Sequence, residues 1–162
     1  MDPVRLLFVC MGNICRSPTA EAVMRHLLVQ EGLQDVVELD SAGTGSWHIG
    51  EPPDGRSTAA ARARGIVMEG AARQVAATDF EAYDLILAAD RQNLEALRAV
   101  APGDAAGRVR LLREYDPAAV IAGDLEVPDP YFGGADGFDH VLDLVDAACR
   151  GLLATLRAEG RV

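Results

Sequence analysis

Lysine is absent from this sequence of 162 residues, so all 15 of its fixed positive side chains are arginines. The 25 aspartates and glutamates outnumber them and give a formal net charge of −10 at pH 7. Nucleic acids and anionic membrane surfaces attract clustered lysine and arginine side chains. This acidic chain is therefore predicted to bind neither nucleic acid nor a membrane surface.

Long apolar runs are absent as well, since no stretch approaches the roughly 20 apolar residues that span a bilayer. The N-terminal run from Val4 to Cys10 contains Arg5 and lacks the small-residue pattern of a cleaved signal peptide. Cysteine is scarce: Cys10, Cys15 and Cys149 form an odd set in a chain long enough to need no disulfide. Free thiols favour a reducing compartment, so we expect a cytoplasmic location.

Repeats and low-complexity segments are lacking, and 49% of the residues are hydrophobic, as in an ordinary globular protein. The length is that of one domain, so we expect a single domain over residues 1–162. Apolar runs predict strands at 4–9, 36–42, 85–88 and 109–112. Amphipathic or Ala-rich spacing predicts helices from Pro18 towards Gly32, at 57–64 and 93–100, and from Phe138 onward. A stretch rich in Pro, Gly and Asp, residues 116–137, precedes the last helix.

Strand and helix alternation predicts an α/β fold: an open, mostly parallel four-stranded sheet with helices on both faces. Ligands bind such sheets beyond the carboxyl ends of the strands. The first strand ends in Cys-Met-Gly-Asn-Ile-Cys-Arg-Ser-Pro, residues 10–18. A helix that begins here offers unpaired N–H groups to an anion. Gly12 and Asn13 readily adopt left-handed conformations that aim successive N–H groups inward. The sequence thus predicts a phosphate-binding loop after the first strand.

Three side chains of this loop suit phosphate chemistry. Arg16 can bind two phosphate oxygens in a fork, which a lysine could not do. The electropositive loop should favour the thiolate form of Cys10, and Ser17 could donate a hydrogen bond to it. A lone cysteine is commonly just a small core residue. The full Cys-x5-Arg-Ser pattern, placed between a buried strand and an amphipathic helix, favours a nucleophilic thiolate.

The stretch Cys10–Pro18 resembles the signature of the low-molecular-weight protein tyrosine phosphatases, down to Gly-Asn-Ile-Cys-Arg-Ser-Pro. The resemblance covers nearly the whole chain and includes Asp40–Thr44, Trp47, Asp54–Arg56, Ala72–Gln74 and Asp129–Gly133. It implies a cysteine-dependent phosphatase that hydrolyses phosphotyrosine through a phosphocysteine intermediate. The implied substrates are phosphotyrosine-containing proteins or aryl phosphates, and the implied inhibitors are inorganic phosphate or similar oxyanions.

A proton donor is needed for the leaving group, and the sequence alone identifies it weakly. Asp-Pro occurs three times, and each occurrence is an ordinary turn candidate. Asp129 stands out because it lies between two prolines and precedes Tyr131 and Phe132. The resemblance implies that Asp129 is the general acid and base and that Tyr131 and Trp47 are walls of the cleft.

The resemblance also implies roles around the loop. The implied catalytic residues are Cys10, Arg16 and Asp129, and the other implied phosphate-binding residues are Met11, Gly12, Asn13, Ile14, Cys15 and Ser17. Ser41 and Asp90 resemble supporting residues behind the loop. Cys15 is a candidate for a reversible disulfide that shields Cys10 from over-oxidation, for a small buried residue that steadies the loop, or for both, and Cys149 is predicted to be core. Gly70 stands where the family often has a histidine in a network behind the loop.

Other functions fit the sequence less well. A thioredoxin-coupled arsenate reductase needs a further cysteine pair, and no cysteine lies between Cys15 and Cys149. A protein-arginine phosphatase has a threonine where Ile14 stands, and a cysteine phosphocarrier would not need Arg16 and Asp129; both remain as alternatives. An intact Cys10 and Asp129 argue against a non-catalytic phosphopeptide-binding module. The histidines and cysteines lack metal-ligand spacing and there is no Walker loop, so we predict no metal and no cofactor.

Overall fold

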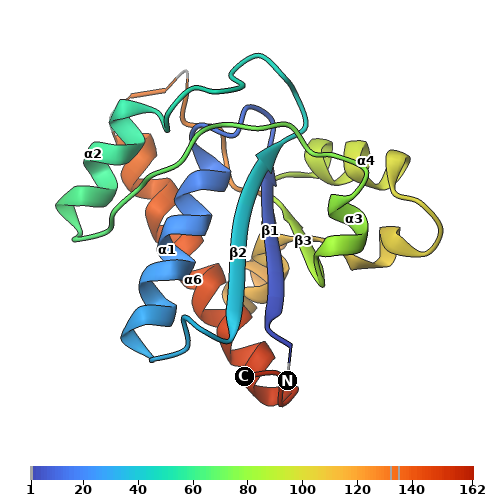
Figure 1. Ribbon diagram of the computed structural model, residues 1–162. Coiled ribbons are helices and arrows are strands. Elements are labelled where there is room, and N and C mark those ends of the chain that lie inside the picture. The colour runs from blue at the N-terminus through green and yellow to red at the C-terminus, as the bar shows by residue number, and fades with distance from the viewer. Residues whose placement is uncertain (1, 132, 135) are drawn as a thin grey trace.

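The computed structural model describes residues 2–131, 133–134 and 136–162. Phe132, one of the two aromatics expected next to Asp129, lies outside the described residues. Four strands, β1 (Val4–Cys10), β2 (Val37–Gly43), β3 (Leu85–Ala88) and β4 (Val109–Leu111), form one sheet in the order β2-β1-β3-β4 (Figure 1). Every strand pair of this sheet is parallel, which confirms the predicted open parallel sheet.

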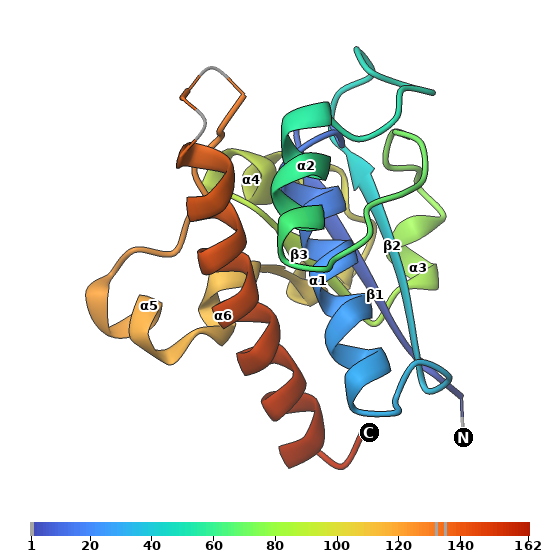
Figure 2. The same ribbon diagram turned by 90° about the vertical axis from the view of Figure 1, so that its left-hand side faces the viewer.

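Helices cover both faces of the sheet (Figures 1 and 2). The helices on one face are α1 (Arg16–Gln30), α2 (Gly55–Ala63) and α6 (Asp136–Ala158), and those on the other are α3 (Asp79–Ala82) and α4 (Arg91–Val100). Two short 3₁₀ helices, η1 (Ala105–Arg108) and η2 (Leu112–Tyr115), and helix α5 (Pro117–Ala122) complete the described structure. No helix within the described ranges is long and apolar enough to span a bilayer.

Strand β1 lies between two hydrophobic cores, one on each face of the sheet. Its residues Leu6 and Phe8 are fully buried in the core formed with α1 and α6. Its residues Leu7 and Val9 are buried in the opposite core, which includes Phe80 of α3. Because both faces of β1 are covered, its sequence is a nearly continuous apolar run rather than an alternating one.

The stretch of residues 116–137 contains helix α5, which was not predicted because the segment is rich in Pro, Gly and Asp. Helix α5 begins after Asp116, whose carboxylate accepts a hydrogen bond from the Ala118 N–H over 3.0 Å. Pro117 occupies the first turn and Gly123 ends the helix with a left-handed φ of 69°. Asp, Pro and Gly therefore act here as a cap, a helix start and a helix stop. Helix α3 and both 3₁₀ helices were likewise not predicted.

The register of the strands brings the candidate residues to one edge of the sheet. Cys10 at the end of β1 pairs with Gly43 at the end of β2, and Val9 pairs with Ala88 at the end of β3. The loops that follow these three strands therefore emerge side by side. This is the edge at which the sequence predicted the site.

Candidate active site

The loop after β1 leads directly into a helix N-terminus. Cys10 is the last residue of β1, and α1 begins at Arg16 with Cys15 in the N-cap position and no side chain capping it. The backbone N–H groups of Thr44 and Gly45 donate to the carbonyls of Cys10 and Met11, both over 2.9 Å. The loop is thus tied to the segment after β2, while the first turn of α1 keeps N–H groups for an anion.

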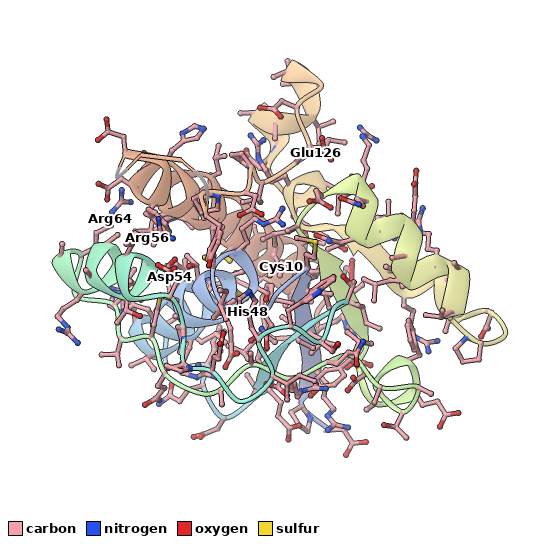
Figure 3. The ribbon with its side chains drawn as sticks, turned by 90° about the horizontal axis from the view of Figure 1, so that it is seen from above. Cys10, His48, Asp54, Arg56, Arg64 and Glu126 are labelled. Atoms are coloured by element: carbon pink, nitrogen blue, oxygen red, sulfur yellow. The ribbon has the colours of Figure 1, made fainter. Side chains whose placement is uncertain are left out.

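A cavity of about 210 Å³ opens over this loop. Its lining residues are Cys10, Met11, Gly12, Ile14, Cys15, Arg16, Trp47, His48, Asp129 and Tyr131. Nine of these ten were predicted site residues. His48 was missed, although its position beside the sole tryptophan of the sequence is a signal that could have identified it. Figure 3, which looks down on this edge of the sheet, shows His48 close to Cys10.

The sulfur of Cys10 is surrounded by hydrogen-bonding groups. The Asn13 backbone N–H donates to Cys10 Sγ over 3.3 Å, and Ser17 Oγ lies 3.0 Å from the same sulfur. Ser17 Oγ already accepts a hydrogen bond from Asn13 Nδ2, so its own proton can go to the sulfur at 3.0 Å or to the Ala42 carbonyl oxygen at 3.4 Å. These contacts suit a thiolate, which accepts both hydrogen bonds.

Arg16 is buried to 5% exposure, and other groups hold its guanidinium. Its Nη1 donates to Asp90 Oδ2 over 2.7 Å and to the Val127 carbonyl over 3.0 Å, while Nη2 lies 3.8 Å from Asp129 Oδ2. Burial alone would lower the pKa of Arg16, but its electrostatic interaction with Cys10 and its hydrogen bond to Asp90 outweigh burial and raise the pKa. The guanidinium therefore stays charged beside Cys10.

Asn13 holds the loop from behind. Its φ of 57° is the one positive value among the described non-glycine residues. Its Nδ2 donates to Ser17 Oγ over 2.8 Å and to Ser41 Oγ over 3.0 Å, and its Oδ1 accepts from the Arg73 N–H over 3.0 Å. Asn13 and Ser17 do not line the cavity. The side chains of Asn13 and Ser17 support the loop through these contacts, and their part in phosphate binding stays a prediction.

Gly12 does not adopt the left-handed conformation that the sequence suggested. A side chain there would instead crowd the imidazole of His48, since an added Cβ would lie 3.0 Å from His48 Cδ2. An added Cβ at Gly43 would lie 2.7 Å from the Met11 carbonyl oxygen. Both glycines thus allow close packing against the phosphate-binding loop.

The absence of the expected histidine leaves space behind the loop. Gly70 has a φ of +105° and borders a small polar cavity of about 70 Å³ together with Asn13 and Ser41. The Arg73 backbone N–H donates to the side-chain oxygen Oδ1 of Asn13, and the Arg73 side chain is fixed by Asp79. Asn13 is therefore fully bonded without a histidine at position 70.

Cys15 and Cys149 differ from Cys10 in their surroundings. Burial raises the pKa of Cys15 to about 12, although a hydrogen bond from Ser57 acts in the opposite direction. Burial also raises the pKa of Cys149, which lies in the core beneath α1. All three cysteines are free thiols. Cys15 and Cys149 are thus neutral at physiological pH.

Asp129 and the aromatic side chains form the mouth of the cavity. Asp129 is one-third exposed, and its Oδ1 accepts a hydrogen bond from the Tyr131 N–H over 3.0 Å. Trp47 is 72% exposed and Tyr131 37%. The His48 and Tyr131 rings are tilted by 51°, with 6.1 Å between their centroids. An acid and several rings therefore surround a deeply buried thiol and guanidinium.

Within residues 2–131, 133–134 and 136–162, no group of three or more His, Cys, Asp or Glu side chains is arranged to hold a metal ion. The polar groups that face the cavity are instead those of an oxyanion site. A thiol at the strand end, an arginine directly after the five intervening residues and a helix N-terminus define a site for a phosphate group on a parallel α/β fold.

Comparison with known proteins identifies this site further. Residues 5–162 match the sequence profile of the family described as low molecular weight phosphotyrosine protein phosphatase. A low molecular weight protein-tyrosine-phosphatase of Streptomyces coelicolor is 53% identical over 160 residues, which cover 97% of both chains. The crystal structure of a protein tyrosine phosphatase from Entamoeba histolytica, with Hepes in its active site, superposes with a TM-score of 0.91 at 37% identity. It covers 98% of this chain and 99% of its own.

A second solved structure, YfkJ from Bacillus subtilis, superposes with a TM-score of 0.90 at 38% identity and covers 98% of both chains. The chain belongs to the low molecular weight phosphotyrosine protein phosphatase family. It is a cysteine-dependent protein tyrosine phosphatase, and its substrates are phosphoproteins. The arginine phosphatase and phosphocarrier alternatives are not favoured by these relatives.

Proposed function

We propose that this chain hydrolyses phosphotyrosine by transferring the phosphoryl group to Cys10 and then to water. The observation that carries this proposal is the convergence of the Cys10 sulfur, the Asn13 N–H and the Arg16 guanidinium beneath one cavity. The loop N–H groups and Arg16 bind the phosphate oxygens. The developing negative charge of the transition state is then stabilised by donors that are already in place.

In the first step, the Cys10 thiolate attacks phosphorus, a sulfur–phosphorus bond forms and the bond to the phenolic oxygen breaks. Protonated Asp129 gives its proton to the departing phenolate. In the second step, Asp129 takes a proton from water as the water oxygen attacks phosphorus. The sulfur–phosphorus bond breaks, Cys10 leaves as a thiolate and inorganic phosphate is released. The 3.8 Å between Asp129 Oδ2 and Arg16 Nη2 supports a role for this carboxyl at the reacting group.

Recognition of the tyrosine ring falls to the mouth of the cavity. Trp47 and Tyr131 line it and present large exposed rings. A phenyl ring of the substrate can stack on such walls, whereas a phosphoserine would not reach them. The same loop would bind inorganic phosphate and similar oxyanions without the ring, so these ions should act as competitive inhibitors. Asp90 and Ser41 have supporting roles, through Arg16 and Asn13 respectively.

A cytoplasmic location is part of this proposal. The three free thiols suit a reducing compartment, and the thiolate mechanism requires Cys10 to stay reduced. Immunodetection in fractionated cells tests the location, and the enzyme should be found in the cytosolic fraction. Recovery with the extracellular medium instead would contradict this part of the proposal.

The experiment that tests the mechanism compares the native protein with Cys10→Ser and Asp129→Ala. Hydrolysis is measured with phosphotyrosine, phosphoserine and phosphoarginine peptides, with and without EDTA. The native protein should release phosphate from phosphotyrosine in EDTA, and Cys10→Ser should be inactive. Turnover that survives in Cys10→Ser would overturn the mechanism. A preference for phosphoarginine would instead revive the arginine phosphatase alternative.

A further inference from the structure

The start of α2 contacts the cleft wall through a cation. The Arg56 guanidinium carbon lies 5.3 Å from the centroid of the Tyr131 ring and 4.7 Å from that of Phe138 on α6. A guanidinium within about 6 Å of an aromatic face is attracted by the quadrupole of the ring. Arg56 therefore joins the Tyr131 wall of the cavity to the beginning of the last helix.

Asp54 fixes the position of this guanidinium. Its Oδ1 accepts hydrogen bonds from the Arg56 backbone N–H over 2.8 Å and from Nε over 3.2 Å, and its Oδ2 accepts one from Nη2 over 3.0 Å. The hydrogen bond to Asp54 raises the pKa of Arg56. A guanidinium held at two points by a carboxylate has little freedom to turn, and its charge is locally balanced.

The same pair is tied to the phosphate-binding loop. The Asp54 backbone N–H donates to the Ile14 carbonyl over 2.8 Å, and Ile14 lines the cavity. A short series of contacts thus runs from Ile14 through Asp54 and Arg56 to the Tyr131 ring. Figure 3 shows Asp54 and Arg56 next to each other at the start of α2, on the same side of Cys10.

We propose that Arg56 is a positioning residue that sets the height of the Tyr131 wall above the phosphate-binding loop. By doing so it favours aryl phosphates over phosphate esters that lack a ring. This inference rests on the proposed function. Because Asp54 balances its charge, Arg56 acts through the ring of Tyr131 rather than on acidic groups of the substrate. Inorganic phosphate needs only the loop, so its binding should not depend on Arg56.

The test measures KM and kcat for a phosphotyrosine peptide and the inhibition constant of inorganic phosphate. Arg56→Met should raise KM about five-fold, because it removes the cation–π contact that holds the Tyr131 ring near the surface. Arg56→Lys keeps the charge but loses the two-point hydrogen bonding to Asp54, so its KM should lie between those of Arg56→Met and the native protein. The phosphate inhibition constant should stay unchanged in both variants.

Arg64→Met is the matched control, since Arg64 follows the same helix and its guanidinium bonds Asp139 and Asp143 of α6 instead of the cleft wall. Its KM should remain native. Equal KM values in Arg56→Met and Arg64→Met, with native turnover intact, would overturn this inference alone. A native protein that released no phosphate would overturn the proposed function itself.

A double-mutant cycle separates positioning from a general effect on folding. In a Tyr131→Leu background Arg56 keeps its contact with Phe138 but has no cleft-wall ring to hold, so Arg56→Met should then leave KM unchanged. Arg56→Met could instead raise KM equally in both backgrounds, or weaken the binding of inorganic phosphate in parallel. Either result would mean that the residue has only a structural role and that the inference is wrong.

Discussion

The floor and the rim of the cleft are built in different ways. The floor, residues 10–17, is a continuous stretch in which Cys10, Asn13, Arg16 and Ser17 are each at most 5% exposed. The rim consists of Trp47, His48, Asp129 and Tyr131, which come from two distant loops and are more exposed. Hydrogen bonds hold the floor, whereas ring contacts hold much of the rim.

This difference indicates that catalysis and substrate recognition depend on different interactions. A buried hydrogen-bonded floor loses function steeply when one partner is removed, because another polar group is left unsatisfied. An exposed aromatic rim loses only part of its contact area. Substitutions in the floor should therefore reduce turnover, and substitutions in the rim should mainly weaken recognition of the ring.

The largest effect is expected at Arg16 in the floor. An ammonium cannot bond Asp90 and the Val127 carbonyl while also holding two phosphate oxygens. Arg16→Lys should lower kcat by about 10²- to 10³-fold, as measured by steady-state hydrolysis of a phosphotyrosine peptide. Arg98→Lys, whose guanidinium donates to the Val109 carbonyl away from the cavity, is the control. A loss below about five-fold at Arg16 would mean that its fork geometry is not needed.

The next effect concerns the support behind the floor. Asn13→Ala removes three side-chain hydrogen bonds. It also places alanine at a φ of 57°, a left-handed conformation that strains alanine but not glycine. We expect kcat/KM to fall about ten- to a hundred-fold and the unfolding free energy to fall by about 2 kcal/mol.

Asn13→Gly separates the two causes, since it keeps the backbone conformation but loses the same hydrogen bonds. It should be as slow as Asn13→Ala in hydrolysis yet more stable in urea unfolding. If Asn13→Gly had native kinetics, the hydrogen bonds of the side chain would not matter to the reaction and only the left-handed backbone would.

A smaller effect is expected at the rim. Trp47→Ala removes a wall for the substrate ring but touches none of the floor hydrogen bonds. KM for the phosphotyrosine peptide should rise about five-fold, while the inhibition constant of inorganic phosphate stays native. Should phosphate binding weaken as much as peptide binding, the separation between floor and rim would fail.

The last prediction concerns the dependence of stability on pH and has the smallest expected effect on the reaction itself. Cys15 ionises at its ordinary pKa of 9.0 in the unfolded chain but at about 12 when folded, because burial disfavours the thiolate. Its contribution to stability is therefore fully present below pH about 9 and is lost as the pH rises towards 12. Urea unfolding of Cys15→Ser should show a shallower decline in this range than the native protein. Parallel declines would contradict this.

The floor could be predicted from the sequence because it is local. Its thiol, arginine and helix start lie within nine residues, and the strand before them is a continuous apolar run. The parallel sheet was predictable for the same reason, since each strand is a short local pattern. The ends of its strands still differ from the predicted ends by a residue or two: β2 ends at Gly43 rather than at Ala42.

The rim could not be predicted by the same reasoning. The proximity of His48 to Tyr131 and of Arg56 to Phe138 depends on how loops far apart in the sequence pack together. Gly12 shows a related limit. Glycine fits there because His48 packs close to it, and not because of its own backbone conformation. The resemblance to a known family supplied Trp47 and Asp129, for which local patterns were weak.

The account depends most on Cys10 as the acceptor of the phosphoryl group, and trapping that intermediate tests it directly. Nitrophenolate leaves without a proton, whereas attack by water needs Asp129 as base, so Asp129→Ala should accumulate the intermediate with p-nitrophenyl phosphate. We expect acid quench and peptide mass spectrometry to find phosphate on Cys10. Continued nitrophenol release with phosphate on another residue, or on none, would contradict the account.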